Sequence, residues 1–553
     1  MGCRKLLLLG LVPFIMHSES AAQSAGSLGT FSGNFQVDGQ YYLEDSKIGA
    51  EEVKEKFLSN GYFNLNYLNG NFSAGLRYEN YANPILGFDT RYKGSGVPYR
   101  FIRYKSDIVD VTGGNFYEQF GSGMIFRTYE DRQLGLDNAL EGIRVKLYPT
   151  EGVELTALIG KMRTFWNTND AIIRAGDVNV EVNSLLPSLM SDDLRLNLGA
   201  SLVSKYQVDK DPTLKLPENV AAGAFRFNLS GNSFSLSSEF AYKPNDPVAT
   251  NNKTYNDGLG LLVQASYFED GLGVSLNMHR IDNFDFRADR TATGNILNMN
   301  YLPPISKQHT YSLSSMYPYS TQLNGEVGLQ AEVNYTFSKE SILGGKYPWD
   351  LNFNFSYINS IDTTHIDKYT YDSPFFTIGD KNYFQDASLY AGKKWSTDLK
   401  SNFGIIYQKY DRDLVEKGGT PTFGKVTSIS AVADFTFKLS AKHSLRTEVQ
   451  HQWYSQDSTV HSKEYTNGNW VAALVEYTIA PKWFFTLLDE YNYGNEYDEK
   501  QLHYFTAAMA YIHSSTRVQL GYGRQRSGIL CAGGVCRQVP SSNGFNLSIS
   551  TSF

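Results

Sequence analysis

Strict alternation of apolar and polar residues is the feature of this sequence that most constrains its fold. From Val327 to Phe337 every second residue is apolar, and the residues between them, which include Glu332, are small or polar. Successive side chains of a β-strand point to opposite faces, so the pattern predicts a strand with one apolar face and one wet face, with Glu332 on the wet side. The same period returns at 351–357 and 429–438. The chain is therefore predicted to be all-β.

Contact with membrane lipid best explains why so many strands have one apolar face. After residue 22 charged residues recur too often for a transmembrane helix, so any membrane span must consist of strands. The 38 Tyr, 34 Phe and 48 Gly, with a mean hydropathy of −0.35, are typical of a barrel with a polar lumen and an aromatic girdle. A secreted soluble β-protein is disfavoured, because each apolar face would need its own dry partner. Turns such as Asn69-Gly70 and Asp270-Gly271 predict a hairpin meander.

The sequence divides into a leader and one barrel. Residues 1–22 are predicted to be a cleaved signal peptide, because Arg4 and Lys5 precede a short apolar run and small residues precede Gln23. Residues 23–553 are expected to form a single large antiparallel transmembrane barrel in the cell outer membrane of a Gram-negative bacterium. A crossing of ~10 residues plus turns and loops gives roughly 20 strands, within about 18–24, with an even count and periplasmic termini.

The end of the chain carries a second signal. The residues from Phe545 to Phe553 alternate and stop on an aromatic residue. This ending resembles the C-terminal assembly signal of bacterial outer-membrane barrels, and an ordinary edge strand is the alternative. Phe553 is therefore taken as an assembly signal, and the barrel-assembly machinery and outer-membrane lipid are the expected partners.

Charge and cysteine content narrow the chemistry. The net charge of −7 gives no nucleic-acid footprint, so no nucleic acid is expected as a partner. Beyond the leader only Cys531 and Cys536 remain, and two thiols in an oxidising compartment usually pair, which predicts a disulfide at a hairpin tip that faces outside. A metal site is the weaker alternative, because no His or further Cys lies nearby. Neither a metal nor a cofactor is expected.

One segment, from residue 91 to 163, crowds both signs of charge together. If its strands turn their polar faces inward, opposed rows of charge would set a transverse field across a narrow water column and select solutes by size and polarity. The alternative of equal weight is a salt-bridged lattice that fills and stiffens the barrel without any solute passing. The candidate constriction residues are Arg127, Arg132, Arg144, Arg103, Glu118, Glu130, Asp131 and Asp137.

Two resemblances bear on this segment. Its glycine-rich and charge-rich stretch at 113–132 resembles the constriction of specific porins and of sugar-polymer export barrels. More closely, the stretches from Asn115 to Gly121, from Asp137 to Arg144 and from Gly523 to Arg537 resemble an uncharacterised family of porin-like outer-membrane barrels of Bacteroidota. That resemblance covers most of the chain and implies an outer-membrane location and membership of a larger surface complex, but it names no ligand.

The function predicted from the sequence is a porin-like barrel that passes or guides a hydrophilic solute. The alternative is a non-conducting structural or accessory subunit of a surface, secretion or assembly complex, whose long loops at 282–324 and 359–386 would dock other outer-membrane or surface proteins. An enzyme is disfavoured, because the nine histidines show no nucleophile, base and orienting group in order. A TonB-coupled transporter is disfavoured too, because alternation begins by Phe31 and leaves no room for an N-terminal plug.

Overall fold

The structure is a computed structural model, and it describes residues 29–188, 191, 193–457, 464–533 and 535–553. The predicted signal peptide, residues 1–22, lies outside the described residues.

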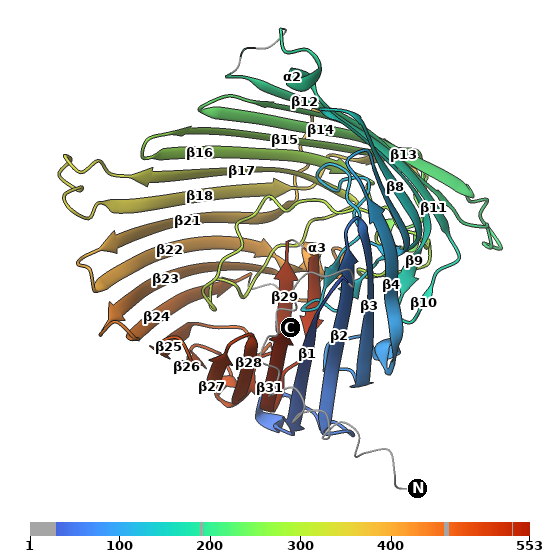
Figure 1. Ribbon diagram of the computed structural model, residues 1–553. Coiled ribbons are helices and arrows are strands. Elements are labelled where there is room, and N and C mark those ends of the chain that lie inside the picture. The colour runs from blue at the N-terminus through green and yellow to red at the C-terminus, as the bar shows by residue number, and fades with distance from the viewer. Residues whose placement is uncertain (1–28, 189–190, 192, 458–463, 534) are drawn as a thin grey trace, which may run out of the picture.

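Across the described residues, 24 long strands form one closed antiparallel wall (Figure 1). Each strand pairs with its neighbours in chain order, and the last returns to the first, from Asn34 opposite Ser552 to Leu43 opposite Asn543. Closure leaves no strand edge with unpaired backbone groups, which is what a lipid surrounding requires. The predicted single all-β barrel is confirmed, with an even strand count at the upper end of the expected range.

The wall consists of β1 (Thr30–Leu43), β2 (Phe57–Asn69), β3 (Phe72–Asn83), β4 (Gly94–Lys105), β5 (Val109–Phe116), β8 (Leu140–Thr150), β9 (Val153–Thr164), β11 (Ile172–Glu181), β12 (Arg195–Tyr206), β13 (Asn219–Ser230), β14 (Phe234–Lys243), β15 (Gly258–Glu269), β16 (Leu272–Asp282), β17 (Gly325–Thr336), β18 (Trp349–Asn359), β21 (Asn382–Lys394), β22 (Leu399–Asp411), β23 (Lys425–Lys438), β24 (His443–Gln456), β25 (Trp470–Ile479), β26 (Trp483–Asn492), β27 (His503–His513), β28 (Thr516–Gln525) and β31 (Ser542–Ser552).

The remaining elements are short and lie in the connections. They are β6 (Glu130–Asp131), β7 (Leu136–Asp137), β10 (Asn167–Thr168), β19 (Thr364–His365), β20 (Tyr371–Asp372), β29 (Gly528–Ala532), β30 (Val535–Val539), α2 (Val182–Leu185), α3 (Arg412–Lys417), and the 3-10 turns η1 (Ser46–Ile48), η2 (Thr90–Tyr92), η3 (Ala249–Asn251) and η4 (Asp498–Lys500). No helix in the described part of the chain is long and apolar enough to cross a membrane.

The two ends of the barrel differ in their connections. One end carries mostly short turns, such as 70–71, 151–152 and 514–515. Strand β1 begins at this end, and strand β31 ends there. The other end, called here the long-loop end, carries the extended connections, the longest of which runs through 283–324. In outer-membrane barrels short turns face the periplasm and long loops face outside, which fits the predicted periplasmic termini.

The outer face of the wall is apolar. On β26 the side chain of Leu487 is 58% exposed, whereas Glu490, on the opposite face, is buried. Aromatic rings gather at the short-turn end, where Trp349 and Trp395 meet with their ring centroids 5.8 Å apart. An apolar belt edged by tryptophan is the surface that a bilayer covers.

The last residue takes part in closing the wall. Phe553 exchanges two backbone hydrogen bonds with Gly33, each 3.0 Å long, and its ring stacks on Phe63. A Cβ at Gly33 would lie 2.7 Å from the Phe553 ring, so glycine makes room for this contact. The assembly-signal role of Phe553 stays a prediction.

An arginine placed on the lipid face should be far more costly than one placed on the neighbouring lumen-facing position. We expect Leu487→Arg to lower the free energy of unfolding in lipid vesicles by about 2–4 kcal/mol, because a charge would lie near the middle of the bilayer. Thr486→Arg is the matched control, because Thr486 points inward and is paired with Glu476 on β25. Urea unfolding followed by tryptophan fluorescence measures both, and equal losses would contradict the assignment of faces.

Candidate functional site

Three connections at the long-loop end fill the lumen instead of projecting from it. We call residues 283–324 the plug, residues 117–139 the inner loop, and residues 528–539, which contain β29 and β30, the capping hairpin. In Figure 1 the yellow-green plug crosses the interior of the barrel. The plug and the inner loop are joined by backbone hydrogen bonds, from Arg127 to Met299 at 2.8 Å and from Tyr301 to Gly123 at 2.9 Å.

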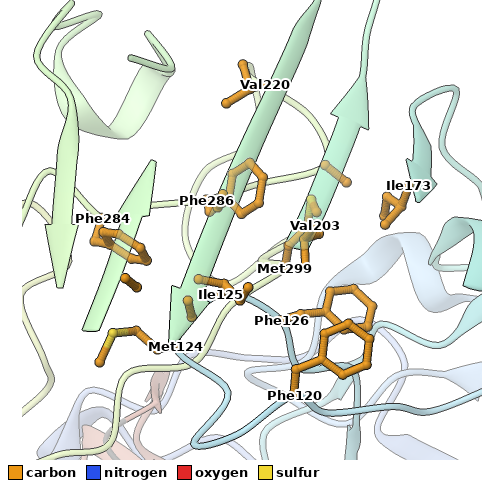
Figure 2. Close-up of a cluster of buried hydrophobic side chains, with 14 of the residues drawn as sticks. Phe120, Met124, Ile125, Phe126, Ile173, Val203, Val220, Phe284, Phe286 and Met299 are labelled. Carbon is orange, nitrogen blue, oxygen red and sulfur yellow. The ribbon is translucent and has the colours of Figure 1, made fainter. Parts of the chain in front are cut away.

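A hydrophobic core holds these segments against one side of the wall. Figure 2 shows Phe284, Phe286 and Met299 of the plug gathered with the aromatic and aliphatic side chains of the inner loop, beside Val203 on β12 and Val220 on β13. Burying a side chain of this size contributes roughly 1.5–3 kcal/mol. The inner-loop members of the core are Phe120, Met124, Ile125 and Phe126.

Small residues on the inner face of the wall make room for this core. Ala222 on β13 and Ala241 on β14 are fully buried against it. A Cβ at Gly260 would lie 2.6 Å from the sulfur of Met124, so a larger residue would displace the inner loop. This part of the lumen is therefore dry and packed, not a water-filled channel.

The plug continues across the lumen to the opposite wall. There Leu313, Met316 and Tyr317 are buried in a second hydrophobic cluster with Tyr410 on β22 and Trp470 on β25. The prediction that the 282–324 loop forms an outer docking surface is therefore wrong. The apolar residues of this loop do not follow the period of a strand or a helix, so the loop does not bury them itself. The strands of the wall bury them instead.

Buried ion pairs fix the plug at its first end. Lys205 on β12 lies 2.5 Å from Asp246 and donates to the backbone carbonyl of Arg287 at 2.7 Å. Arg290 of the plug lies 3.3 Å from the same carboxylate. We call Lys205, Asp246 and Arg290 the plug latch, and all three side chains are at most 3% exposed.

The charge state of the latch depends on Asp246. Burial raises the pKa of this carboxyl, but Lys205, Lys243 and Arg290 outweigh burial and hold the pKa below its ordinary value of 3.8. Because the folded pKa is the lower one, the ionised Asp246 carboxylate contributes its full stabilisation above the ordinary value. This stabilisation is lost as the pH falls from 3.8 through the folded pKa.

Further polar contacts fix the middle of the plug to successive strands. Lys307 lies 3.2 Å from Glu332 on β17, which faces the lumen as predicted. His309 lies 2.6 Å from Asp386 on β21. The backbone of Leu313 is bound by two glutamines of β24, because its N–H donates to Gln450 at 3.0 Å and its carbonyl accepts from Gln452 at 2.8 Å.

The predicted constriction residues lie around the inner loop, and most of them are paired. The pairs are Arg144 with Glu118 at 3.2 Å and with Asp110 at 3.6 Å, Arg103 with Asp110 at 2.5 Å, and Arg132 with Glu130 at 2.7 Å. Arg127 does not take part in these ion pairs. Its guanidinium lies between the rings of Tyr129 and Tyr301, 4.3 and 4.0 Å from their centroids, and Asp131 accepts a hydrogen bond from the backbone of Leu134.

Sequence reasoning missed the centre of this network. Arg77 and Glu79 on β3 are almost fully buried, and Glu79 lies 2.7 Å from both Arg77 and Arg163. Asp137 contacts both arginines, and Glu130 lies 2.9 Å from Arg77. Arg77 and Glu79 lie two residues apart in the sequence, so both are expected on one face of the same strand. This spacing of opposite charges could have indicated an ion pair. The geometry is that of the lattice alternative, since opposite charges are paired at contact distance.

The capping hairpin folds onto the plug. Cys531 and Cys536 form the predicted disulfide. The carbonyl of Cys531 accepts from Gln308 and that of Cys536 from Asn295, both at 2.7 Å. The hairpin lies at the long-loop end, the end that is expected to face outside, and these contacts hold it over the lumen.

A cavity of about 560 Å³ lies between the plug and the wall. It is bordered by plug residues 304–319, by the capping hairpin, by strands β26, β27, β28, β31 and β1, and by Phe384 on β21 and Gln408 on β22. Its polar lining carries two arginines, Arg524 and Arg526, the first 2.7 Å from Asp45 and the second 3.6 Å from Glu490. None of the predicted constriction residues borders this cavity.

Removing the shared carboxylate of the plug latch should release the plug. We expect Asp246→Ala to lower the free energy of unfolding by about 3–5 kcal/mol, because Lys205 and Arg290 would remain buried without a counterion. Chemical unfolding of the detergent-solubilised barrel measures the change, and limited proteolysis within 283–324 reports release of the plug. Asp89→Ala removes an exposed pair with Arg91 and should cost about 1 kcal/mol or less. A loss of similar size in both variants would contradict the latch.

Comparisons with known proteins complete the description. A comparison with the curated proteins found no match. Among solved structures, the P pilus usher PapC translocation pore is similar at 10% identity and a TM-score of 0.45, with 94% of this chain and 99% of that chain covered. The siderophore receptor PirA from Pseudomonas aeruginosa gives 10% identity and a TM-score of 0.39 over 96% of this chain and 81% of that one.

A third similar structure is the FrpB iron transporter from Neisseria meningitidis, at 9% identity and a TM-score of 0.36, with 95% of this chain and 83% of that chain covered. These likenesses concern the fold alone. The sequence itself matches a family over residues 3–553, nearly its whole length. The chain therefore belongs to the family of unknown function DUF6029.

Proposed function

We propose that this protein is an outer-membrane barrel that guides a hydrophilic solute along a narrow, capped path beside its plug, and that it is not an enzyme. The observation that carries the proposal is the cavity of about 560 Å³ between the plug and the wall, which is lined by both polar and apolar side chains and which the capping hairpin covers. Outer-membrane lipid and the barrel-assembly machinery are its proposed partners. A Bacteroidota family is the proposed origin.

The distribution of packing supports a capped path and argues against an open pore. The lumen beside β11–β15 is filled by a dry core, and the lumen beside β21–β25 is crossed by the plug. The path that we propose runs along the cavity, past Arg524 and Arg526. Ile529 and Leu530 of the capping hairpin border this space, so displacement of the hairpin would open it at the long-loop end.

A non-conducting scaffold is the second candidate, and one observation favours it. The connection between β18 and β21 exposes Phe376, Ile366 and Ile378, at 95%, 70% and 62% respectively. Exposed apolar residues in one loop mark surfaces where another protein binds. A docking loop above a filled barrel would suit a structural subunit.

Conductance distinguishes the two candidates. In planar bilayers we expect the unaltered protein to be nearly closed, and a variant with 528–539 replaced by a short Gly-Ser linker to show a larger steady conductance, because the cap over the cavity is gone. Replacement of 339–346, a turn at the opposite end, is the matched control. If the barrel without its capping hairpin folds and stays closed, the path does not exist and the scaffold takes its place.

Charge substitutions locate the path within the lumen. In the variant that lacks the capping hairpin, Arg526→Ala should shift ion selectivity toward cations, because a cationic group would leave the wall of the path. Arg144→Ala should leave selectivity unchanged, because Arg144 is paired with Glu118 away from the cavity. Reversal potentials in a salt gradient measure the ion selectivity of both variants. A shift with Arg144→Ala alone would contradict a path through the cavity and would support a path through the predicted constriction residues.

A further inference from the structure

Two residues that line the cavity each carry a buried amide oxygen without a hydrogen-bond partner among the described residues. Gln408 on β22 is only 3% exposed, and its Oε1 has no hydrogen-bond partner among the described residues. Asn543 on β31 donates to Asp45 at 3.1 Å, while its buried Oδ1 likewise has no partner among them. Both residues line the cavity. A buried acceptor without a partner is costly, so these atoms call for a group that donates hydrogen bonds.

The charges around the cavity are already neutralised. Arg524 is paired with Asp45, and Arg526 lies 3.6 Å from Glu490. On the plug side His309 contacts Asp386, and Lys307 contacts Glu332. A charged ligand would have to separate one of these pairs, which leaves a partner without its counterion. The lining therefore favours a solute that carries no net charge.

The rest of the polar lining consists largely of amides and hydroxyls. Such groups both donate and accept, and they match a ligand that carries many hydroxyl groups. The volume of about 560 Å³ also lies within the range of roughly 300–1,000 Å³ that is usual for small-molecule sites. These lining residues include Gln40, Ser315, Thr506, Gln525 and Asn546.

We propose that this cavity is a binding site for an uncharged, hydroxyl-rich solute of the size of a short oligosaccharide. The inference rests on the proposed function and names the class of solute that the path would guide. Hydroxyl groups of the solute donate to Gln408 Oε1 and Asn543 Oδ1, and the remaining amides bind its other hydroxyls.

The test is binding to the full barrel in detergent micelles, where both ends are accessible and passage is not needed. The probes are maltotriose, cellotriose and N-acetylated chitotriose as uncharged sugars, with trigalacturonate, trilysine and trialanine as charged and peptide counterparts. Isothermal titration is made on the unaltered protein and on the variant without the capping hairpin. We expect at least one uncharged trisaccharide to bind more tightly than every charged or peptide probe.

Gln408→Leu is the decisive variant. It is close in shape to the original residue and removes an unpartnered oxygen, so folding should be unchanged or slightly more stable, while saccharide binding falls about tenfold. Gln264→Leu is the matched control, a lumen-facing glutamine on β15 that bonds Asn277 at 3.1 Å outside the cavity, and it should leave binding unchanged.

Three results would overturn the proposal: no binding by any uncharged trisaccharide, tighter binding of a charged or peptide probe, or equal losses in Gln408→Leu and Gln264→Leu. Conductance is measured separately, so the two proposals can fail independently. Binding without conduction would keep the site and reject the path, whereas conduction without saccharide binding would keep the path and reject this solute.

Discussion

Everything in this protein depends on the pairing of backbone groups around a ring. In hydrocarbon each unpaired N–H or C=O costs several kcal/mol, so a sheet is stable there only if its first and last strands meet. The pairing of β1 with β31 meets this requirement, and Phe553 extends it to the final residue. A closed ring of 24 strands encloses a lumen that is too wide for the side chains of the wall to fill. Other parts of the chain must therefore fill it.

The protein fills that lumen with its own connections, and the wall is adapted to them. Where the plug and inner loop pack, the inner face carries small residues such as Ala222 and Gly260. Where the plug crosses, the inner face carries Asp386, Gln450 and other hydrogen-bonding groups that bind its backbone and side chains. The inside of the barrel thus resembles the core of a soluble protein on one side, and on the other side it combines a hydrophobic cluster with direct hydrogen bonds to the plug.

The barrel could be predicted from the sequence because its cause is local. Alternation along a strand follows from which side faces lipid, and the residues from Val327 to Phe337 display it without reference to any other segment. The disulfide followed from cysteine content and compartment in the same way. The inner charges were found as a group, but their partners, such as Arg77 with Asp137, come together only through the curvature of the wall.

The plug could not be predicted, because its apolar residues have no period. Leu313, Met316 and Tyr317 are buried with side chains of several later strands, and a connection rich in Tyr, Asn and Pro has the composition of a surface loop. The cavity was missed for the same reason. It is bounded by both ends of the chain and by its middle, so no single stretch of sequence outlines it.

The position of the plug in the middle of the chain means that its contacts join both halves of the barrel. Its first anchors, Lys205 on β12 and Asp246 after β14, precede it in the chain, whereas Gln452 on β24 and the capping hairpin follow it. Neither half of the wall alone therefore provides the full surface against which the plug packs. The contacts of the plug and the joining of β31 to β1 both need strands from the two halves of the chain. In this barrel, the filling of the interior and the closure of the ring depend on the same long-range pairing.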